Sequence, residues 1–409
     1  MRILLGAGLA IAIPSALHAE PLTFKGAIER AVGEAPSLQA SEARTAAARS
    51  AAIAADRLPD PTLEIGIRDF PVTGPDAGTF HRDNFTMTTV GVSQQFINPA
   101  KRHARADRAR ADVGIAEAAS AEELRTVRLE TALSWVDLYY AEKRLTQLQQ
   151  LNTSLGDLQA TVTARLASGS ARPSQALEPD QLRAAVSDRR SELAAEVAKA
   201  RARLVRYTGD PLAEVAGAPP SAQVDAAQLS ASIDVLPRLR TLNARASAAD
   251  AEITLARADK RPDWTVNASY GRREPTFGDL VSVGVSIDLP FFGKRRQDPK
   301  IAARASEAQQ ARFERDAAGR EATAALTADL ADHEMHHQRL LNARATLVPL
   351  AKQRAELDQA SYAAGKLDLG SALLSSLALA EAEVDALARE AEVARDAVLI
   401  NYTYGEAQL

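Results

Sequence analysis

The sequence predicts a mainly α-helical chain with a small β portion, organised as two halves that each run helix, strand, strand, long helix, helix. Two related seven-residue stretches indicate the duplication, residues 96–102 (FINPAKR) and 289–295 (LPFFGKR), 193 positions apart. A strand pair that starts at a proline precedes each stretch, and a very long Ala-rich segment ended by Gly169 or Gly365 follows it. A repeat of this length is a duplicated half and not a solenoid unit.

The first residues predict an exported protein. A basic start, an apolar stretch and small residues up to Ala19 form the three regions of a secretory signal, with cleavage expected after Ala19. The apolar stretch is too short for a membrane-spanning helix, which needs ~20 residues. We therefore expect a signal peptide over 1–19, a first structural repeat over 20–222 and a second over 223–409.

Composition excludes several classes of protein. The chain has no cysteine, so it has no disulfide, no thiolate metal site and no thiol for an N-terminal lipid. A net charge of -4 gives no attraction to nucleic acid. An aromatic content of 4% is low for a large barrel or a globular core, whereas Ala, Leu, Glu, Arg and Gln at helical spacing favour long packed helices.

The first half is expected to begin with a helix over 22–57 that Thr23 can cap. Apolar and polar residues alternate in 62–70, which is the pattern of a strand with one apolar face. The return strand over 85–96 alternates less cleanly, because Met87 is out of phase with the valines that follow it unless a bulge intervenes.

The second strand pair, about 263–271 and 280–290, alternates throughout. Its polar face carries only small hydroxyls, amides and glycines, which suits a wet lumen, and its apolar face suits lipid, although a strand of a soluble sandwich has the same pattern. Trp264 and Tyr270 lie near opposite ends of their strand, as in aromatic belts. Four strands cannot close a barrel and an open edge cannot face lipid, so we expect several copies to pool their strands.

The long helices are expected at about 102–167 and 298–364. At ~1.5 Å per residue the first spans roughly 100 Å, which is too long for the interior of a globular domain. Pro349 should kink the second, because proline lacks a backbone donor. After the glycine turns the chain is expected to run back as helices over 175–207 and 370–402.

These features together resemble the TolC family of outer-membrane efflux ducts, and the resemblance covers the whole mature chain. Within that family, residues 87–96 with the turn at 99–102 are most similar to the heavy-metal branch, the CzcC and CusC type. Residues 362–369 resemble the family's second periplasmic tip. The resemblance implies a homotrimer whose twelve strands form a membrane β-barrel, continued by an α-helical tunnel across the periplasm.

The function that the resemblance implies is passive efflux of heavy-metal cations through the outer membrane, after delivery by an inner-membrane RND transporter and a periplasmic adaptor (membrane fusion) protein. The same fold serving drug efflux or type I secretion is one alternative. A non-conducting periplasmic coiled-coil protein is another, which would not need amphipathic strands. Motifs of hydrolases, phosphate loops and zinc proteases are missing from the sequence, so we expect no enzyme and no cofactor.

The expected site residues fall into three groups. Adaptor docking is expected at the two helix tips, at Gly169, Ser170, Arg172, Gly365, Lys366, Leu367 and Leu369. The start of each long helix is expected to meet anionic lipid at the periplasmic membrane interface, through Lys101, Arg102, Lys294, Arg295 and Arg296. Asp368 is expected at the pore constriction, because the family's paired carboxylates are replaced in this chain by Ser371 and Leu374.

The only dense histidine group lies at 332–337. His333 and His337 are one helical turn apart and could ligate a metal with Asp332 or Glu334. A solvated stripe on a long helix is the simpler interpretation, since no second cluster matches it. A tight site would also hold back the ions that a duct must release. We therefore predict no metal site.

Overall fold

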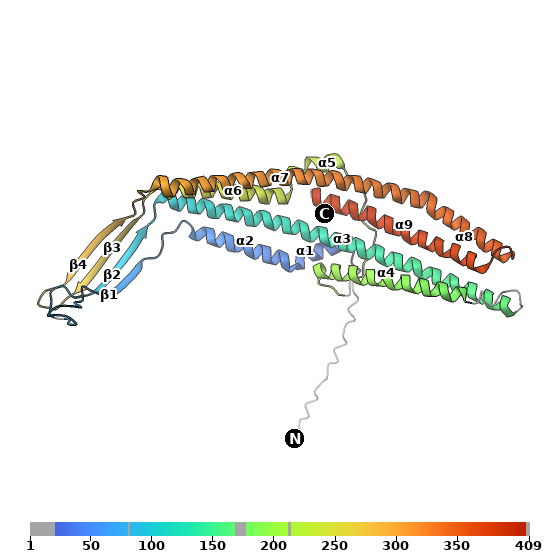
Figure 1. Cartoon of the computed structure of the whole chain (residues 1–409), viewed down its shortest axis with the longest axis horizontal. Helices are drawn as coiled ribbons and strands as arrows, with labels where there is room; N and C mark the ends of the chain where they lie inside the picture. Colours follow the sequence, from blue (N-terminus) through green and yellow to red (C-terminus); the bar gives the residue numbers. More distant parts are fainter. Residues whose placement is uncertain (1–20, 81, 168–176, 212–213, 406–409) are drawn as a thin grey trace, which may run out of the picture. The chain divides into compact units, whose positions relative to one another are not determined.

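The computed structural model describes residues 21–80, 82–167, 177–211 and 214–405 (Figure 1). Its helices and strands, in chain order, are α1 (Phe24–Glu34), α2 (Pro36–Ala54), β1 (Thr62–Arg68), β2 (Met87–Phe96), α3 (Pro99–Ala167), α4 (Glu178–Thr208), α5 (Ala226–Ala231), η2 (Ile233–Val235), α6 (Pro237–Ala258), β3 (Trp264–Arg272), β4 (Leu280–Ile287), α7 (Gly293–Asn342), η3 (Ala343–Leu347), α8 (Val348–Ala363) and α9 (Leu369–Tyr404). A mainly helical chain with one four-stranded sheet confirms the predicted fold class. Within the described residues, no helix is both long and apolar enough to cross a membrane.

The chain divides into two compact units. The strand unit comprises Pro36–Arg125 and Ala227–Leu326, and the hairpin unit comprises Met1–Ala35, Thr126–Ala226 and Thr327–Leu409. Each unit takes residues from both sequence halves, because α3 and α7 each contribute one part to the strand unit and the other to the hairpin unit. The compact units therefore cut across the duplicated halves.

The helix expected over 22–57 is two helices. Thr23 caps α1, with its Oγ1 accepting a hydrogen bond from the Gly26 N–H at 3.1 Å. Ala35 then leaves the helical region at φ -62° and ψ 120° before α2 begins at Pro36. A residue that precedes proline is pushed toward extended backbone, so Pro36 explains the break.

The two long helices respond differently to proline. Pro99 is the first residue of α3, where its missing donor costs nothing, and α3 continues for 69 residues. Pro299 lies inside α7, which begins at Gly293, earlier than expected. Before Pro349 the chain forms the π-helical turn η3, in which the Val348 N–H bonds the Ala343 carbonyl. This wider turn is the disturbance expected at Pro349.

The sheet has the strand order β1-β2-β3-β4 with every neighbouring pair antiparallel (Figure 1). The bulge considered for β2 does not occur, since Met87 pairs with Arg68 in unbroken register. Met87 instead lies over Gly271 of β3, where a β-carbon would come within 2.6 Å of the Met87 Sδ. The missing side chain of Gly271 thus makes room for a large residue on the polar face.

Two apolar clusters stabilise the hairpin unit. The first centres on Trp135 of α3, whose Nε1 donates to the Leu22 carbonyl at 2.8 Å and whose ring stacks on Tyr139. Phe24 of α1 meets the same indole edge-on. The second cluster joins α3, α4, α8 and α9 through Leu148, Leu182, Val186, Leu193, Tyr362, Leu369 and Leu373. Leucines at helical spacing on α3 and α4 therefore pack against the α8–α9 hairpin.

Candidate functional site

One face of the sheet is largely apolar across all four strands, with Thr88, Gln94 and Arg272 as polar members. Leu63 pairs with Val92, Val92 with Ala268, and Ala268 with Val283, so these side chains form one row. The row on one side contains Ile65, Val90, Tyr270 and Val281. On the other side, one row contains Gln94, Val266 and Val285, and the next contains Phe96, Trp264 and Ile287. Val283 is 72% exposed and most of this face is likewise open. Such a continuous exposed apolar surface marks a face that meets lipid or another protein.

The opposite face is polar and most of its residues are small, with Arg68, Met87 and Gln95 among the larger ones. It carries Glu64, Thr89, Gly91, Ser93, Thr265, Asn267, Ser269, Ser282, Gly284 and Ser286. A β-carbon at Gly284 would lie 2.7 Å from the Asn267 Oδ1, and one at Gly91 would lie 3.1 Å from the Ser269 Cβ. Both glycines therefore leave space for the polar side chain on the next strand. The sequence alternation predicts the two faces, but the register alone shows which residues share a row.

A buried ion pair ties the strands to the helices. The Lys101 Nζ lies 2.8 Å from the Asp263 Oδ2, and the Asn98 N–H donates to the other Asp263 oxygen at 2.8 Å. Both charged side chains are only 11% exposed. The Asp263 carbonyl also accepts from the Asp288 N–H at 3.0 Å. This Lys101–Asp263 clamp fastens the start of α3 to the start of β3 inside the strand unit.

The clamp also changes the chemistry of Asp263. Burial disfavours its charged form, but the Asn98 N–H and the Lys101 ammonium outweigh burial and hold the Asp263 pKa below the usual range. Lys101 is thus engaged with Asp263 and does not offer its charge to lipid. Sequence reasoning placed Lys101 in an exposed cluster and missed Asp263 as its partner, although a proline-aspartate pair before each strand pair was the available signal.

The remaining basic residues at the helix starts are placed differently. Lys294, Arg295 and Arg296 are exposed in the first turn of α7, and Arg102 is half-buried. A cavity of about 440 Å³ beside the clamp is lined by Arg261 and Arg296, together with Lys101, Asp259, Asp288, Leu289, Pro290, Gln297 and Lys300. Lys300 is paired with Asp259 at 2.7 Å. The cavity is therefore rimmed by two guanidinium groups with no ion pair in the described part of the chain.

The α8–α9 tip is closed by two local motifs. Gly365 has φ 73°, its N–H bonds the Tyr362 carbonyl at 3.0 Å, and the Lys366 N–H bonds the Ser361 carbonyl at 2.8 Å, as in a Schellman C-cap. Asp368 then caps α9 through bonds from the Ser371 N–H at 2.9 Å and the Ser371 hydroxyl at 2.7 Å. These bonds, the hydroxyl's first, lower the Asp368 pKa. Asp368 is exposed and charged at neutral pH.

One expectation for the tip is wrong. Leu369 was expected to offer apolar surface to a partner, but it is 1% exposed because it packs into the second apolar cluster with Leu373. Leu367 is half-buried against the same cluster. The exposed leucine of this tip is Leu374, at 64%. The other predicted tip, at Gly169, Ser170 and Arg172, lies outside the described residues.

The histidine group contacts α9. The His336 Nδ1 lies 2.7 Å from the Asp396 Oδ2, and the His333 Nδ1 lies 4.0 Å from the same oxygen. Burial lowers the His333 pKa, against the attraction of Asp396. Across the described chain, His, Asp and Glu form no group of three that could hold a metal ion. The two histidines that approach the same carboxylate are therefore His333 and His336. The sequence interpretation had paired His333 with His337 instead.

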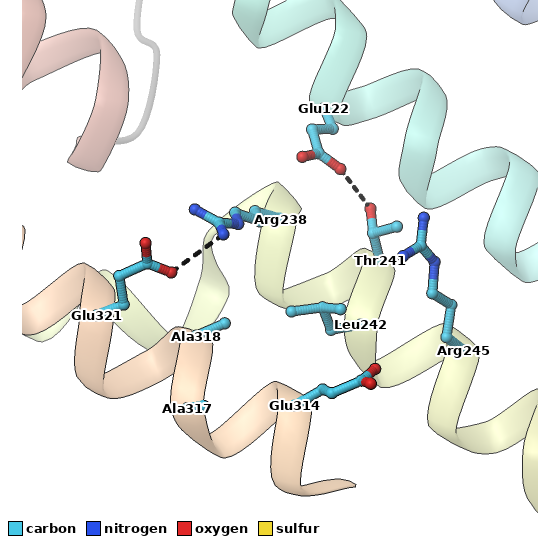
Figure 2. A pocket seen from close by; sticks show the side chains of 9 residues that line it. All are labelled: Glu122, Arg238, Thr241, Leu242, Arg245, Glu314, Ala317, Ala318 and Glu321. Atoms are coloured by element: carbon cyan, nitrogen blue, oxygen red, sulfur yellow. Dashed lines mark hydrogen bonds and ion pairs between the residues drawn. The ribbon is translucent and has the colours of Figure 1, made fainter. Parts of the chain in front are cut away.

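A cavity of about 580 Å³ in the strand unit lies among α3, α6 and α7 (Figure 2). Its lining mixes both charges, and two polar bonds cross it: Arg238 to Glu321 at 3.1 Å, and the Thr241 hydroxyl to Glu122 at 2.9 Å. These bonds connect α6 to α7 and to α3. Near-balanced charge and a largely open rim make this cavity a gap between helices rather than a site for a small ligand.

Comparison with known proteins identifies solved structures that have a similar fold. No family model matches the sequence, and no curated protein matches it either. A membrane protein from Pseudomonas aeruginosa is 16% identical, with a TM-score of 0.79, over 93% of this chain and 90% of that chain. The CmeC outer membrane channel of Campylobacter jejuni is 11% identical, with a TM-score of 0.77, over 93% and 85%. CusC, a protein described as forming a transmembrane channel, is 14% identical, with a TM-score of 0.77, over 99% of both chains.

The chain has the fold of these outer-membrane channels. At such identities the likeness establishes the fold, in agreement with the resemblance to the TolC family that the sequence predicts. CmeC and CusC are both described as channels. The heavy-metal branch and the roles of single residues stay predictions.

Proposed function

We propose that this protein is the outer-membrane channel of a tripartite efflux system, a passive duct that extends into the periplasm. The observation that carries the proposal is the sheet with one apolar and one polar face in register across four strands. A barrel wall needs such a sheet, because lipid lies outside it and water inside it. The fold shared with CmeC and CusC supports the same location.

Closure of the barrel requires several copies. Strands β1 and β4 are the two edges of the sheet, and each has one side with no neighbouring strand in the described part of the chain. Such edges cannot face lipid, so β4 of one copy pairs with β1 of the next, and three copies give twelve strands. A non-conducting coiled-coil protein has no need of this sheet, which argues against that alternative.

Purified protein tests the proposal directly. In mild detergent we expect the mass of a trimer, and in planar lipid bilayers we expect stepwise conductance. The helices alone cannot supply either result, since closing the sheet is what makes the pore. A monomer with a full β signal in circular dichroism and no conductance would contradict the duct.

The cargo we propose is heavy-metal cations, handed over by an inner-membrane RND transporter through a periplasmic adaptor. The resemblance of residues 87–102 to the heavy-metal branch supports this cargo. Drug efflux and type I secretion remain the competing uses of the duct. A deletion strain that becomes sensitive to metal salts but not to drugs, and regains resistance from a plasmid copy, separates them.

We propose that the two tips dock the adaptor. At the described tip Gly365, Lys366 and Leu374 are exposed, and Leu367 lies between them and the core. Gly169, Ser170 and Arg172 are proposed for the other tip from the sequence alone. The fold of the tip is set by Gly365, because its positive φ is open to few other residues.

Leu374→Asp is expected to abolish resistance without lowering the amount of trimer in the outer membrane. The side chain is 64% exposed, so the change removes an apolar contact with a partner but little of the core. Leu350→Asp is the matched control, because Leu350 is 58% exposed on α8 and lies several turns before the tip. Equal loss of resistance in both variants, or none in either, would remove Leu374 from the docking surface.

Asp368→Asn separates two roles of that residue. Asparagine caps helices about as well as aspartate, so this variant keeps the cap and removes the charge, whereas Asp368→Ala removes both. If three copies of Asp368 form an anionic ring, both variants lose cation selectivity in single-channel recordings to the same extent. Selectivity that survives in Asp368→Asn limits Asp368 to capping α9.

At the membrane interface we propose that Arg296 and Arg261 bind anionic lipid headgroups. They rim the cavity beside the clamp, and that cavity adjoins the ends of the strands. Arg102 is proposed for the same interface from the sequence. Headgroup phosphates would offset cations that otherwise oppose the dipole at the start of α7.

A further inference from the structure

The duplication gives the Lys101–Asp263 clamp a counterpart. Pairing of β1 with β2 sets Leu63 opposite Val92, and pairing of β3 with β4 sets Val266 opposite Val285. Val285 follows Val92 by 193 positions (285 minus 92), the same offset as the two seven-residue stretches. Val266 follows Leu63 by 203 positions (266 minus 63).

These offsets identify the equivalent of each clamp residue. The residue 203 positions before Asp263 is Asp60. It lies shortly before β1, as Asp263 lies directly before β3. The residue 193 positions after Lys101 is Lys294, which lies in the first turn of α7. A carboxylate and an ammonium therefore stand at both equivalent positions.

The helix starts add one refinement. The Arg102 N–H bonds the Asn98 carbonyl at 3.1 Å, and the Arg296 N–H bonds the Phe292 carbonyl at 2.9 Å. These equivalent bonds are 194 positions apart (296 minus 102), so one residue is inserted before α7. Counted from the helix starts, the equivalent of Lys101 is Arg295 rather than Lys294. Both residues are cations, so either alignment places a positive charge at this position.

The second clamp cannot close within one chain. Asp60 lies before β1 at one edge of the sheet, and Lys294 and Arg295 lie after β4 at the other edge. All three side chains are exposed, and within the described residues none has an ion pair. In the clamp that is closed, by contrast, β2 and β3 are adjacent strands.

We propose that Asp60 of one copy binds the Lys294–Arg295 pair of the neighbouring copy and so repeats the Lys101–Asp263 clamp at the seam between copies. The proposal rests on the proposed function, which sets β4 of one copy beside β1 of the next. A second copy, and not lipid, is then the partner of Lys294 and Arg295. The seam clamp fixes the register of the joint, because a slip of the strands separates the charges.

The natural absence of cysteine allows a clean test. Asp60→Cys is combined with Lys294→Cys or with Arg295→Cys in the full chain, assembled in outer membranes and treated with a short bifunctional thiol reagent. Lys101→Cys with Asp263→Cys, the closed clamp, shows that the reagent spans this distance. Each single variant is the control for random joining.

We expect a shift from monomer to covalent trimer on denaturing gels for at least one Asp60 pair and for none of the single variants. A trimer by native mass in which neither pair is joined, while the in-chain pair is, would overturn the seam clamp and leave the duct standing. A wild-type protein that is monomeric in mild detergent would instead overturn the proposed function, and the seam clamp with it.

Discussion

Asp263→Ala is expected to lower the free energy of unfolding by about 3 kcal/mol, because it leaves a buried ammonium without its partner. Lys101 is only 11% exposed, so its ammonium is poorly solvated once the carboxylate is removed. The Asn98 N–H loses its acceptor in the same change. Both losses fall where β2 becomes α3, so the junction of the strand unit should open first.

Tryptophan fluorescence can follow this change. The chain has two tryptophans, and Trp264 directly follows Asp263, so Trp135→Phe leaves a reporter beside the clamp. Urea titrations at fixed protein concentration then compare variants. Replacing both partners, as Lys101→Met with Asp263→Leu, should cost much less than Asp263→Ala, because no charge remains buried. Equal losses of unfolding free energy in the two variants would show that the buried unpaired charge is not the cause of the instability at this junction.

The pH dependence of the clamp follows from the lowered Asp263 pKa. A carboxyl whose folded pKa lies below its unfolded value, ordinarily about 3.9, adds stability above that value. The added stability is lost as the pH falls through the folded pKa. Asp263→Ala should therefore flatten the decline of stability below about pH 4 relative to the wild type.

Val283→Arg is expected to prevent insertion, whereas Ser282→Arg is expected to be tolerated. Val283 lies in the middle of the apolar face of β4, and a lipid-facing arginine near the bilayer midplane costs about 2–4 kcal/mol per copy. Ser282 is its neighbour on the polar face of the same strand. The two variants thus add the same charge at nearly the same depth, on opposite faces.

The measurement is the amount of trimer in outer-membrane fractions, followed by conductance of the purified protein. Loss of trimer for Val283→Arg with a normal amount for Ser282→Arg supports a lipid-facing apolar side. Conductance of Ser282→Arg should also shift toward anions, since its charge would line the lumen. Equal behaviour of the two variants would mean that the faces do not separate lipid from water.

The sequence predicted the parts of this fold that depend on local pattern. Alternation predicted the four strands, Ala, Leu, Glu, Arg and Gln at helical spacing predicted the long helices, and glycine predicted the turn at Gly365. It failed at Ala35, where the expected single helix breaks because the next residue is a proline. It also failed at Leu369, because periodicity does not say which apolar residue near a turn finds a core to enter.

The sequence by itself determined the two-fold plan, the two faces of each strand and the helical character of the rest, because each is a property of residues close together in the chain. The tertiary structure decided the partnerships between distant residues. Lys101 meets Asp263 across 162 positions, and His336 meets Asp396 across 60, only because adjacent strands and packed helices bring them together. Among the residues that the structure describes, the same charge on Lys294 has no such neighbour, since β4 is an edge of the sheet.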